Sequence, residues 1–493
     1  MSADQAETRR KNTKRTTVPD IVRQDDTIAA IATPFGTGGI GIVRASGPMT
    51  IPLFKSVFRP ARPVRTIRSH HLYYGWVVDP GDNNLVDEVL AVVMMAPHSY
   101  TTEDVLEIQC HSGPAVVRRI LEILLEDGAR LAEPGEFTKR AFLGGRIDLA
   151  QAEAVLDLTL APASTAGRLA VNQLQGHFSQ RLGEIRATLL EALAAIEVAI
   201  DYPEEDLEIL QETQLSELLS RRVIDPLQSL ADAFTRGSIY KTEQEVLIVG
   251  IPNVGKSSLL NAIVCEDRAI VTSIPGTTRD TIEATAELGG IAVRLVDTAG
   301  IRPDPDPIER LGMRKIREKL DTARLILWML DVTRPLTADD MEVGRNLIPL
   351  AGKDRVVLVF NKIDLDQAWK NAADDLFNEI VQAFPSLESA VRAAVSASRG
   401  DGLDSLAAKI TGRLLDDDTG EPLSVVPNLR QKEVLQKAIV STDRACAALS
   451  AGMPPDLVAI DLRDALNVLG EITGHNITDE ILDHIFSNFC LGK

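Results

Sequence analysis

The spacing of apolar residues divides the chain into segments of different character. Residues 26–144 mix short apolar runs with one amphipathic stretch. The apolar runs within Asp26–Arg44, Leu85–Met95 and Val105–Gln109 are typical of strands, and Ala115–Asp127 has the spacing of an amphipathic helix. This mixture predicts an α+β domain with antiparallel strand pairing.

Leucine, alanine, glutamate and glutamine at helical spacing dominate the next part of the chain, and this character returns near the C-terminal end. Only Pro162 and Pro203 interrupt the first helical block strongly. The predicted helices are Leu149–Leu160, Leu169–Val198, Leu215–Ala233, Asn428–Ala451 and Pro455–Phe486.

We expect the two helical blocks to form one all-α domain that holds an inserted α/β domain. Short linkers near 240 and 413 fit this arrangement, because an inserted domain needs its two ends close together. Two unrelated helical domains are the alternative. The expected boundaries are a disordered tail at 1–25, an N-terminal domain at 26–144, the helical domain at 145–241 and 413–493, and the inserted domain at 242–412.

The composition argues against a membrane-spanning or secreted protein. The 493 residues include no apolar run long enough to span a membrane, and the four cysteines form no Cys-x-x-Cys pair, which favours a reducing compartment. The first 25 residues lack the apolar core of a secretory signal, so we expect a cytoplasmic protein; a mitochondrial presequence is disfavoured by Asp4 and Glu7. With a net charge of −19, any RNA contact must use a local basic patch or a basic partner.

The most informative motif is GIPNVGKSS at Gly250–Ser258. It follows the strand-like run Val246–Val249 and precedes the helix-like run Leu259–Val264. A strand, a glycine-rich loop and a helix form the context of a phosphate-binding loop, whose backbone N–H groups face a polyphosphate. We therefore expect Lys256 to lie along the β- and γ-phosphates and the Ser257 hydroxyl to bind Mg²⁺.

Three later motifs indicate which nucleotide is bound. In LVDTAG, a strand ends at Asp297, which would hold Mg²⁺ indirectly, and the Gly300 N–H can reach the γ-phosphate. In NKID, the Asp364 carboxylate can accept two hydrogen bonds from guanine, and adenine offers no such pair. Asn361 would buttress this loop, and Lys362 would lie over the base.

The third motif follows the apolar run that ends at Val395, where the Ala397 N–H can meet guanine O6. Together these motifs predict a GTPase domain. Ile301 replaces the glutamine that orients the attacking water in many regulatory GTPases. Arg302–Pro307 is too rich in proline for a helix and is expected to be a mobile switch loop, after which Glu309 could swing toward the γ-phosphate.

Further segments cover nearly all of the chain beyond residue 25: DTIAAIATPFGTGGIGIVRASG, SYTTEDVLEIQCHSG, PGEFTKRAFLGGRIDLAQAEAV, LGEITG at Leu469–Gly474 and the terminal CLGK. With these segments and the nucleotide motifs, the chain resembles the tRNA-modification GTPase MnmE (TrmE) family. The resemblance implies a homodimer formed through an N-terminal domain similar to folate-binding aminomethyltransferase domains. It also implies K⁺-stimulated GTP hydrolysis.

The family works with a flavin-dependent partner, MnmG, which uses FAD and NADH. Together they add an aminomethyl or carboxymethylaminomethyl group to carbon 5 of the wobble uridine in certain tRNAs, with a one-carbon unit from 5-formyltetrahydrofolate or a related tetrahydrofolate. By the same resemblance Arg44, Glu107, Arg146 and Lys493 would line the folate pocket, although many members have lysine where this chain has Arg146. Arginines can clamp carboxylates, and a carboxylate can accept from an aminopyrimidine edge.

The resemblance also assigns the ions and the catalytic group. Asn253, with Thr272, Ile274 and Thr277, would hold K⁺; Thr278 would join Ser257 on Mg²⁺; and Glu309 would orient the attacking water. Pro275 departs from the small residue expected in the ion-closing loop. The expected GTP-binding residues are Asn253, Val254, Gly255, Lys256, Ser257, Ser258, Thr272, Ser273, Ile274, Pro275, Gly276, Thr277, Thr278, Asp297, Thr298, Ala299, Gly300, Asn361, Lys362, Ile363, Asp364, Ser396, Ala397 and Ser398.

Two questions stay open at this point. Cys490 is a candidate nucleophile if nearby Lys493 lowers the pKa of its thiol, but a buried small apolar residue is an equal alternative. The main functional alternative is a regulatory or assembly GTPase that acts as a timed switch on RNA or ribosomes, without folate chemistry. The GTPase motifs alone do not separate the two functions.

Overall fold

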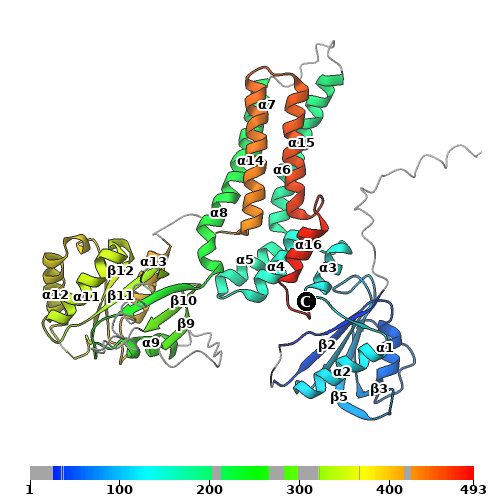
Figure 1. Cartoon of the computed structure of the whole chain (residues 1–493), viewed down its shortest axis with the longest axis horizontal. Coiled ribbons are helices and arrows are strands. Elements are labelled where there is room, and N and C mark those ends of the chain that lie inside the picture. Colours follow the sequence, from blue (N-terminus) through cyan, green and yellow to red (C-terminus); the bar gives the residue numbers. More distant parts are fainter. Residues whose placement is uncertain are drawn as a thin grey trace, which may run out of the picture. The chain divides into compact units, whose positions relative to one another are not determined.

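The computed structural model describes residues 26–34, 36, 38–201, 212–265, 282–297, 320, 322–365, 367–415 and 423–493 (Figure 1). The chain divides into two compact units. The first comprises Met1–Leu156, Phe178–Ile224 and Lys437–Lys493, and the second comprises Asp157–His177 and Asp225–Gln436.

The first unit contains a seven-stranded sheet in the order β3-β4-β5-β6-β2-β1-β7. Neighbouring strands are antiparallel except β1 and β7, which are parallel. This confirms the predicted α+β domain. The strands are β1 Ile28–Ile31, β2 Gly41–Ser46, β3 Phe58–Pro60, β4 His71–Val78, β5 Leu85–Met94, β6 Val105–Cys110 and β7 Arg130–Leu131.

Helices cover this sheet unequally. Helices α1 (Thr50–Val57) and α2 (Pro114–Glu126) bury Phe54 and Ile120 in the core of one face. On the other face, α3 (Glu136–Leu143) packs Phe137 against β1, next to the end strand β7. Side chains of β4 and β5 on this second face are exposed, so the face is not covered across its whole width.

The remaining helices of the first unit include α6 (His177–Asp201), α7 (Glu212–Leu219), α15 (Pro455–Thr473), α16 (Asp479–Ser487) and the later part of α14 (Leu429–Ser450). In Figure 1, α6, α14 and α15 run beside one another. Arg463 of α15 pairs with Glu197 of α6 at 2.9 Å, and Arg444 of α14 pairs with Asp461 of α15 at 2.9 Å. The start of α4 (Leu149–Leu160) packs on α16.

Three helices that the sequence predicts as continuous are interrupted in the structure, so these predictions are wrong. Leu169–Val198 is divided between α5 (Ser164–Leu174) and α6, because Gly176 takes a left-handed φ of 88°. Pro455–Phe486 is divided into α15 and α16, because Gly474 has a φ of 89°.

The third, Leu215–Ala233, is interrupted by a π turn at Ser220–Ile224 between α7 and α8 (Asp225–Lys241). Pro226 lacks a backbone N–H and cannot bond the carbonyl one turn earlier, which gives a physical reason for the break. The helices Leu149–Leu160 and Asn428–Ala451 are confirmed to within a residue.

The second unit holds a six-stranded sheet in the order β13-β12-β11-β8-β10-β9, parallel except for β9. Helices α9 and α13 pack on one face and α11 and α12 on the other, which gives the predicted α/β layers. The elements are β8 Gln244–Val249, α9 Lys256–Cys265, β9 Ile282–Leu288, β10 Ile291–Asp297, β11 Leu325–Asp331, α11 Ala338–Ala351, β12 Val356–Asn361, α12 Trp369–Ala383, β13 Val391–Val395 and α13 Leu403–Leu414.

Strands β11 and β12 are buried at every position, as expected of central strands covered on both faces. No helix within the described ranges is both long and apolar enough to cross a membrane.

Candidate nucleotide-binding site

The loop between β8 and α9 lies at the carboxyl end of a central strand, where ligands of open α/β sheets bind. Asn253 has a φ of 63° and Gly255 a φ of 100°, so the chain turns sharply before α9 begins at Lys256. A Cβ on Gly255 would lie 2.3 Å from the Asn361 Nδ2 atom. Glycine at 255 therefore allows both the turn and the close approach of Asn361.

Asn361 joins this loop to the later motifs. Its Nδ2 donates to the Val254 carbonyl at 2.7 Å, and its Oδ1 accepts from the Ala397 N–H at 3.0 Å. Its side chain is buried at the end of β12. The Ala397 N–H, which we expected to meet guanine O6, is thus bonded to Asn361 in this structure.

Lys256 and Ser257 occupy the start of α9. The Lys256 Nζ donates to the carbonyls of Gly250 and Ile251 at 2.7 and 3.0 Å. Burial lowers the pKa of Lys256, and the negative charge of Asp297 opposes that shift.

The Ser257 hydroxyl donates to Asp297 Oδ2 at 2.6 Å, and Asp297 ends β10 fully buried. These neighbouring oxygen atoms are the donors that a hard cation such as Mg²⁺ takes, so the residues fit the ion.

Asp364 lies in the NKID loop, where its side chain is largely buried and its carboxylate is held in place. Ser396 Oγ donates to its Oδ1 at 2.7 Å, and Ser398 Oγ donates to its Oδ2 at 3.4 Å. The hydrogen bond from Ser396 is the main cause that lowers the pKa of Asp364, and the charge of Arg399 adds to it. The carboxylate is therefore ionised at neutral pH and can accept from a base edge.

Asp331 is a residue of this site that sequence reasoning missed. It ends β11 in register with Asn361, and its Oδ2 lies 2.6 Å from the Lys362 Nζ. Its Oδ1 accepts from the Thr333 N–H and hydroxyl at 3.0 and 2.7 Å. Burial alone raises the pKa of Asp331, but the bonds from Lys362 and Thr333 lower it overall. The sequence signal for this residue is that the apolar run Leu325–Asp331 ends in an aspartate.

Several expected residues lie outside the described part of the chain. These are the ion-closing loop, most of the LVDTAG motif beyond Asp297, the proline-rich segment and the catalytic glutamate: Thr272, Ser273, Ile274, Pro275, Gly276, Thr277, Thr278, Thr298, Ala299, Gly300, Arg302–Pro307 and Glu309. Their expected roles stay predictions.

In the first unit, the sheet brings Arg44 and Glu107 together. They are register partners on β2 and β6, and Nε and Nη2 of Arg44 lie 2.8 and 2.7 Å from Glu107 Oε1. The Arg44 guanidinium also lies 5.6 Å from the ring centres of Tyr100 and Phe137. The pair is half-buried, which keeps these polar groups within reach of solvent.

Two other predicted pocket elements lie beside this pair. Arg146 stacks 4.8 Å from the centre of the Tyr100 ring and donates to the Tyr100 carbonyl at 3.0 Å. The C-terminal turn approaches Arg44, whose Nη1 lies 3.5 Å from the Gly492 carbonyl, and the Lys493 N–H donates to the Cys490 carbonyl at 3.2 Å. Tyr100, which the sequence did not single out, contacts both arginines.

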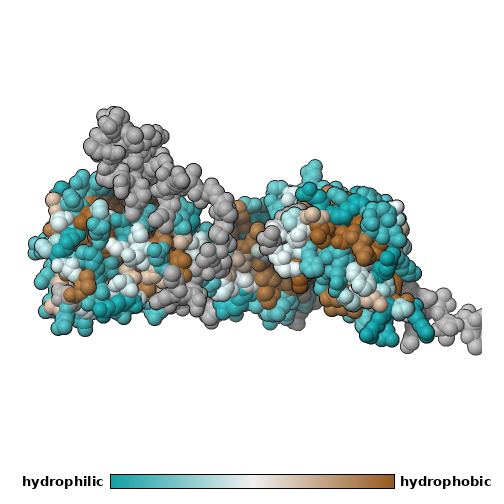
Figure 2. Space-filling view, turned by 90° about the horizontal axis from the view of Figure 1, so that it is seen from below, coloured by the Kyte–Doolittle hydropathy of each residue, from teal (hydrophilic) through white to brown (hydrophobic). Residues whose placement is uncertain are grey.

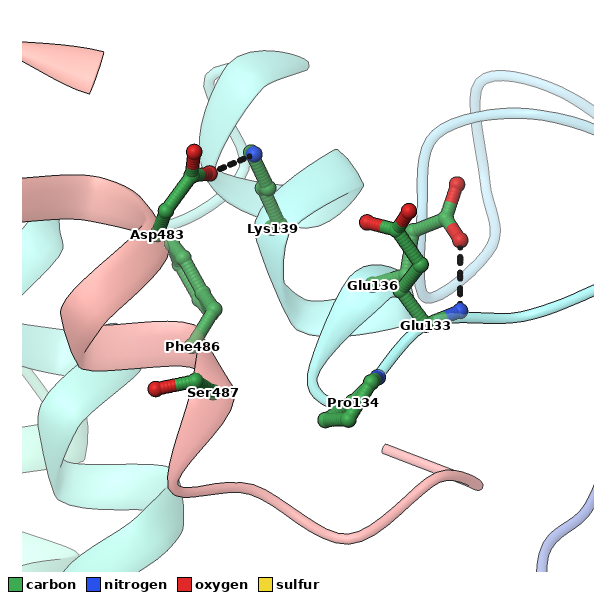
Figure 3. Close-up of a pocket in the computed structure, with 7 residues that line it drawn as sticks. All are labelled: Glu133, Pro134, Glu136, Lys139, Asp483, Phe486 and Ser487. Carbon is green, nitrogen blue, oxygen red and sulfur yellow. Dashed lines mark hydrogen bonds and ion pairs between the residues drawn. The ribbon is translucent and has the colours of Figure 1, made fainter. Parts of the chain in front are cut away.

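The Cys490 side chain is exposed, so the alternative of a buried small apolar residue is wrong for this cysteine. A separate cavity of about 220 Å³ lies near α3 and α16 (Figure 3). Its polar groups are largely occupied, since Lys139 pairs with Asp483 at 2.6 Å and Glu136 accepts from Arg130 and Arg140. None of the predicted folate residues lines it.

Comparison with known proteins identifies the family. Residues 27–146 match the family described as the GTP-binding protein TrmE N-terminus, and residues 149–490 match the MnmE helical domain. A tRNA modification GTPase MnmE of Carboxydothermus hydrogenoformans is 46% identical over 473 residues, which cover 95% of this chain and 100% of the relative. The chain belongs to the MnmE family.

Other relatives of the same name agree. Those of Symbiobacterium thermophilum and Geobacter sulfurreducens are 46% and 45% identical, over 95% of this chain and 100% and 99% of their own lengths. A crystal structure of Era in complex with MgGDPNP and nucleotides 1506–1542 of 16S ribosomal RNA is 31% identical over 41% of this chain and 66% of that chain, with a TM-score of 0.29. That score is too low to carry a structural argument. Membership in the MnmE family accords with the α+β, all-α and P-loop α/β parts described above.

Proposed function

We propose that this chain is a K⁺-stimulated GTPase that works with a flavin-dependent partner of the MnmG kind. Together they would add an aminomethyl or carboxymethylaminomethyl group to carbon 5 of the wobble uridine of certain tRNAs. The one-carbon unit would come from 5-formyltetrahydrofolate or a related tetrahydrofolate, with FAD and NADH on the partner. Family membership supports the coarser statement, a GTPase of tRNA modification. The reaction would take place in the cytoplasm.

The observation that carries the nucleotide assignment is the pair of bonds made by Asn361. They couple the phosphate loop at Val254 to the loop at Ala397, while Asp364 stands as an ionised acceptor beside them. A rigid acceptor for a purine edge, fixed to a phosphate loop, suits guanine rather than adenine.

In the proposed hydrolysis, Lys256 would bind the β- and γ-phosphates, since the carbonyls of Gly250 and Ile251 hold its Nζ at the loop. Ser257 and Asp297 would hold Mg²⁺, which offsets phosphate charge when bound. Glu309 would orient the attacking water, and Asn253 with the loop Thr272–Thr278 would hold K⁺ in the role of an arginine finger.

The hydrolytic assignments have two direct tests. Glu309→Ala should lower GTP turnover at least tenfold and leave GDP affinity near the wild-type value; unchanged turnover would remove Glu309 from the mechanism. Replacing K⁺ by Na⁺ at equal ionic strength should slow hydrolysis of the wild-type chain. Equal rates in the two salts would contradict the K⁺ site.

The folate assignment draws support from the Arg44–Glu107 pair, from Arg146 stacked on Tyr100 and from the nearby C-terminal turn. Guanidinium groups suit the carboxylates of a folate tail, and Glu107 suits its aminopyrimidine edge. Saturable binding of 5-formyltetrahydrofolate should be lost in Arg44→Ala and kept in Arg181→Ala, an exposed arginine of α6. No binding by the wild type at millimolar ligand would favour a pure switch GTPase.

The proposed homodimer draws support from the uncovered face of the first unit's sheet. Leu72 and Tyr74 of β4 and Leu90 of β5 are 51%, 49% and 39% exposed on that face. Figure 2 shows apolar residues gathered on the side of this domain that faces the viewer. Since exposed apolar clusters commonly mark interfaces, Leu72→Glu with Leu90→Glu should shift the sedimentation of the chain from dimer to monomer. A variant that sediments as the wild type would place the interface elsewhere.

The whole function is tested by deleting the gene and measuring modified nucleosides in bulk tRNA by mass spectrometry. Loss of the 5-aminomethyl-type uridines, restored by the wild type and not by Glu309→Ala, is the expected result. An unchanged nucleoside profile would overturn the proposal and favour the regulatory GTPase.

A further inference from the structure

Strand β3 and its connection to β4 are basic on a chain that is strongly acidic as a whole. The chain has 52 lysines and arginines against 71 aspartates and glutamates. Yet the stretch from Thr27 to Val78 contains no acidic residue, and arginines recur at every third position after Phe58. We call these residues the arginine segment: Arg59, Arg62, Arg65 and Arg68.

The positive charge of the arginine segment is not neutralised within the described residues. All four side chains are exposed, and none of them forms an ion pair with a described carboxylate. Arg59 donates to the neutral Asn83 side chain at 2.6 Å. The acidic side chains that follow β4 and lie on β5 are bound by other groups: Asp79 by Arg119, Asp82 by Asn84, Asp87 by His111, and Glu88 by the Tyr74 hydroxyl.

The backbone of the segment is anchored, so these charges are presented from a fixed surface. Val64 and Ile67 pack against the core beneath α1 and α2. The Arg68 N–H donates to the Tyr73 hydroxyl at 2.7 Å. Apolar residues therefore fix the connection to the domain, while the four arginines remain exposed.

We propose that the arginine segment is a docking surface for the phosphate backbone of tRNA. The inference rests on the proposed tRNA-modifying role. Ten residues span at most roughly 33–36 Å, which allows contact with several phosphate groups of a polyanion. Exposed guanidinium groups without carboxylate partners bind phosphates bidentately and release counterions from RNA. An acidic chain repels RNA elsewhere, so a local patch of this kind sets where contact occurs.

The test compares two double variants of the full-length chain. Arg62→Gln with Arg65→Gln removes two charges from the arginine segment, and Arg181→Gln with Arg186→Gln removes two exposed arginines from α6 as a matched control. Binding of fluorescently labelled tRNA is measured by anisotropy over a series of KCl concentrations. Intrinsic GTP turnover without tRNA should be unchanged in both, which shows that each variant is folded.

We expect the first variant to raise the Kd for tRNA at least tenfold and the control less than twofold. The slope of log affinity against log salt should also fall by about 1.5 in magnitude, since each lost phosphate contact removes about 0.7 to 0.9. Equal affinity and slope in the two variants would overturn the docking surface. The proposal would also be overturned if the first variant bound tRNA like the wild type but lost binding to phosphatidylserine vesicles. That result would indicate a membrane surface as the partner.

Failure of the docking surface and failure of the proposed function give different results. If the function is right and the surface is wrong, the wild type restores the wobble nucleosides and the arginine-segment variant binds tRNA like the control. If the function is wrong, deletion of the gene leaves the nucleoside profile unchanged.

Discussion

Replacing Asn361 by alanine should weaken guanine-nucleotide binding, because Asn361 holds two loops of the binding site together. The change removes two buried hydrogen bonds, to the Val254 carbonyl at 2.7 Å and from the Ala397 N–H at 3.0 Å. A buried polar group left without a partner costs about 1–3 kcal/mol, so the two together cost roughly 2–6 kcal/mol. Since both groups lie in binding loops, we expect at least about 2 kcal/mol of this to appear in nucleotide affinity.

About 2 kcal/mol corresponds to roughly a thirtyfold increase in Kd. The assay is a titration of the full-length chain with a fluorescent GDP analogue at fixed K⁺ and Mg²⁺. Asn371→Ala is the matched control, because it removes the same side chain from an exposed position of α12. A Kd for Asn361→Ala within threefold of the wild type would refute the idea that Asn361 couples the two loops.

Three further changes test other parts of the structure. Asp331→Asn removes the charge beside the Lys362 Nζ and should weaken GDP binding about tenfold. The control Asp374→Asn loses an exposed ion pair and should bind GDP like the wild type, as measured by the same titration. Ser257→Ala removes the hydroxyl that meets Asp297 and should raise the Mg²⁺ concentration for half-maximal GTP turnover at least tenfold; an unchanged value would contradict the Mg²⁺ assignment. Burial raises the pKa of Glu136, but hydrogen bonds from Arg130, the Glu133 N–H and Arg140 lower it overall from 4.5. Its carboxylate therefore stabilises the folded state above about pH 4.5, and this stabilisation is lost as the pH falls through the lowered folded pKa. On acidification, the urea midpoint of unfolding should fall less in Glu136→Gln than in the wild type.

The elements that carry the nucleotide motifs could be predicted well from the sequence. Strands β8, β10 and β12 and helix α9 lie where their apolar runs indicated, because each run is short, continuous and ended by a polar motif. The α+β character of the N-terminal part was predictable for the same reason, since β5, β6 and α2 have clear periodicity.

The breaks in the long helices were not predictable in the same way. Gly176 and Gly474 interrupt apolar patterns that continue on both sides, and a glycine inside a helical pattern is often tolerated. Whether it takes a left-handed φ depends on packing that the pattern does not contain. For Gly474, the packing is close: a Cβ there would lie 2.6 Å from the Phe142 ring.

The candidate site shows the same limit at the level of side chains. The sequence indicates which polar residues end the strands, but not which of them pair across the sheet. Because β11 lies between β8 and β12 in parallel register, Asp331 is brought level with Asn361, and its carboxylate reaches the neighbouring Lys362. The motif NKID thus gains a partner from another strand that no spacing within the motif reveals. Once the strand order is known, every polar residue at the carboxyl edge of such a sheet is a candidate for the site.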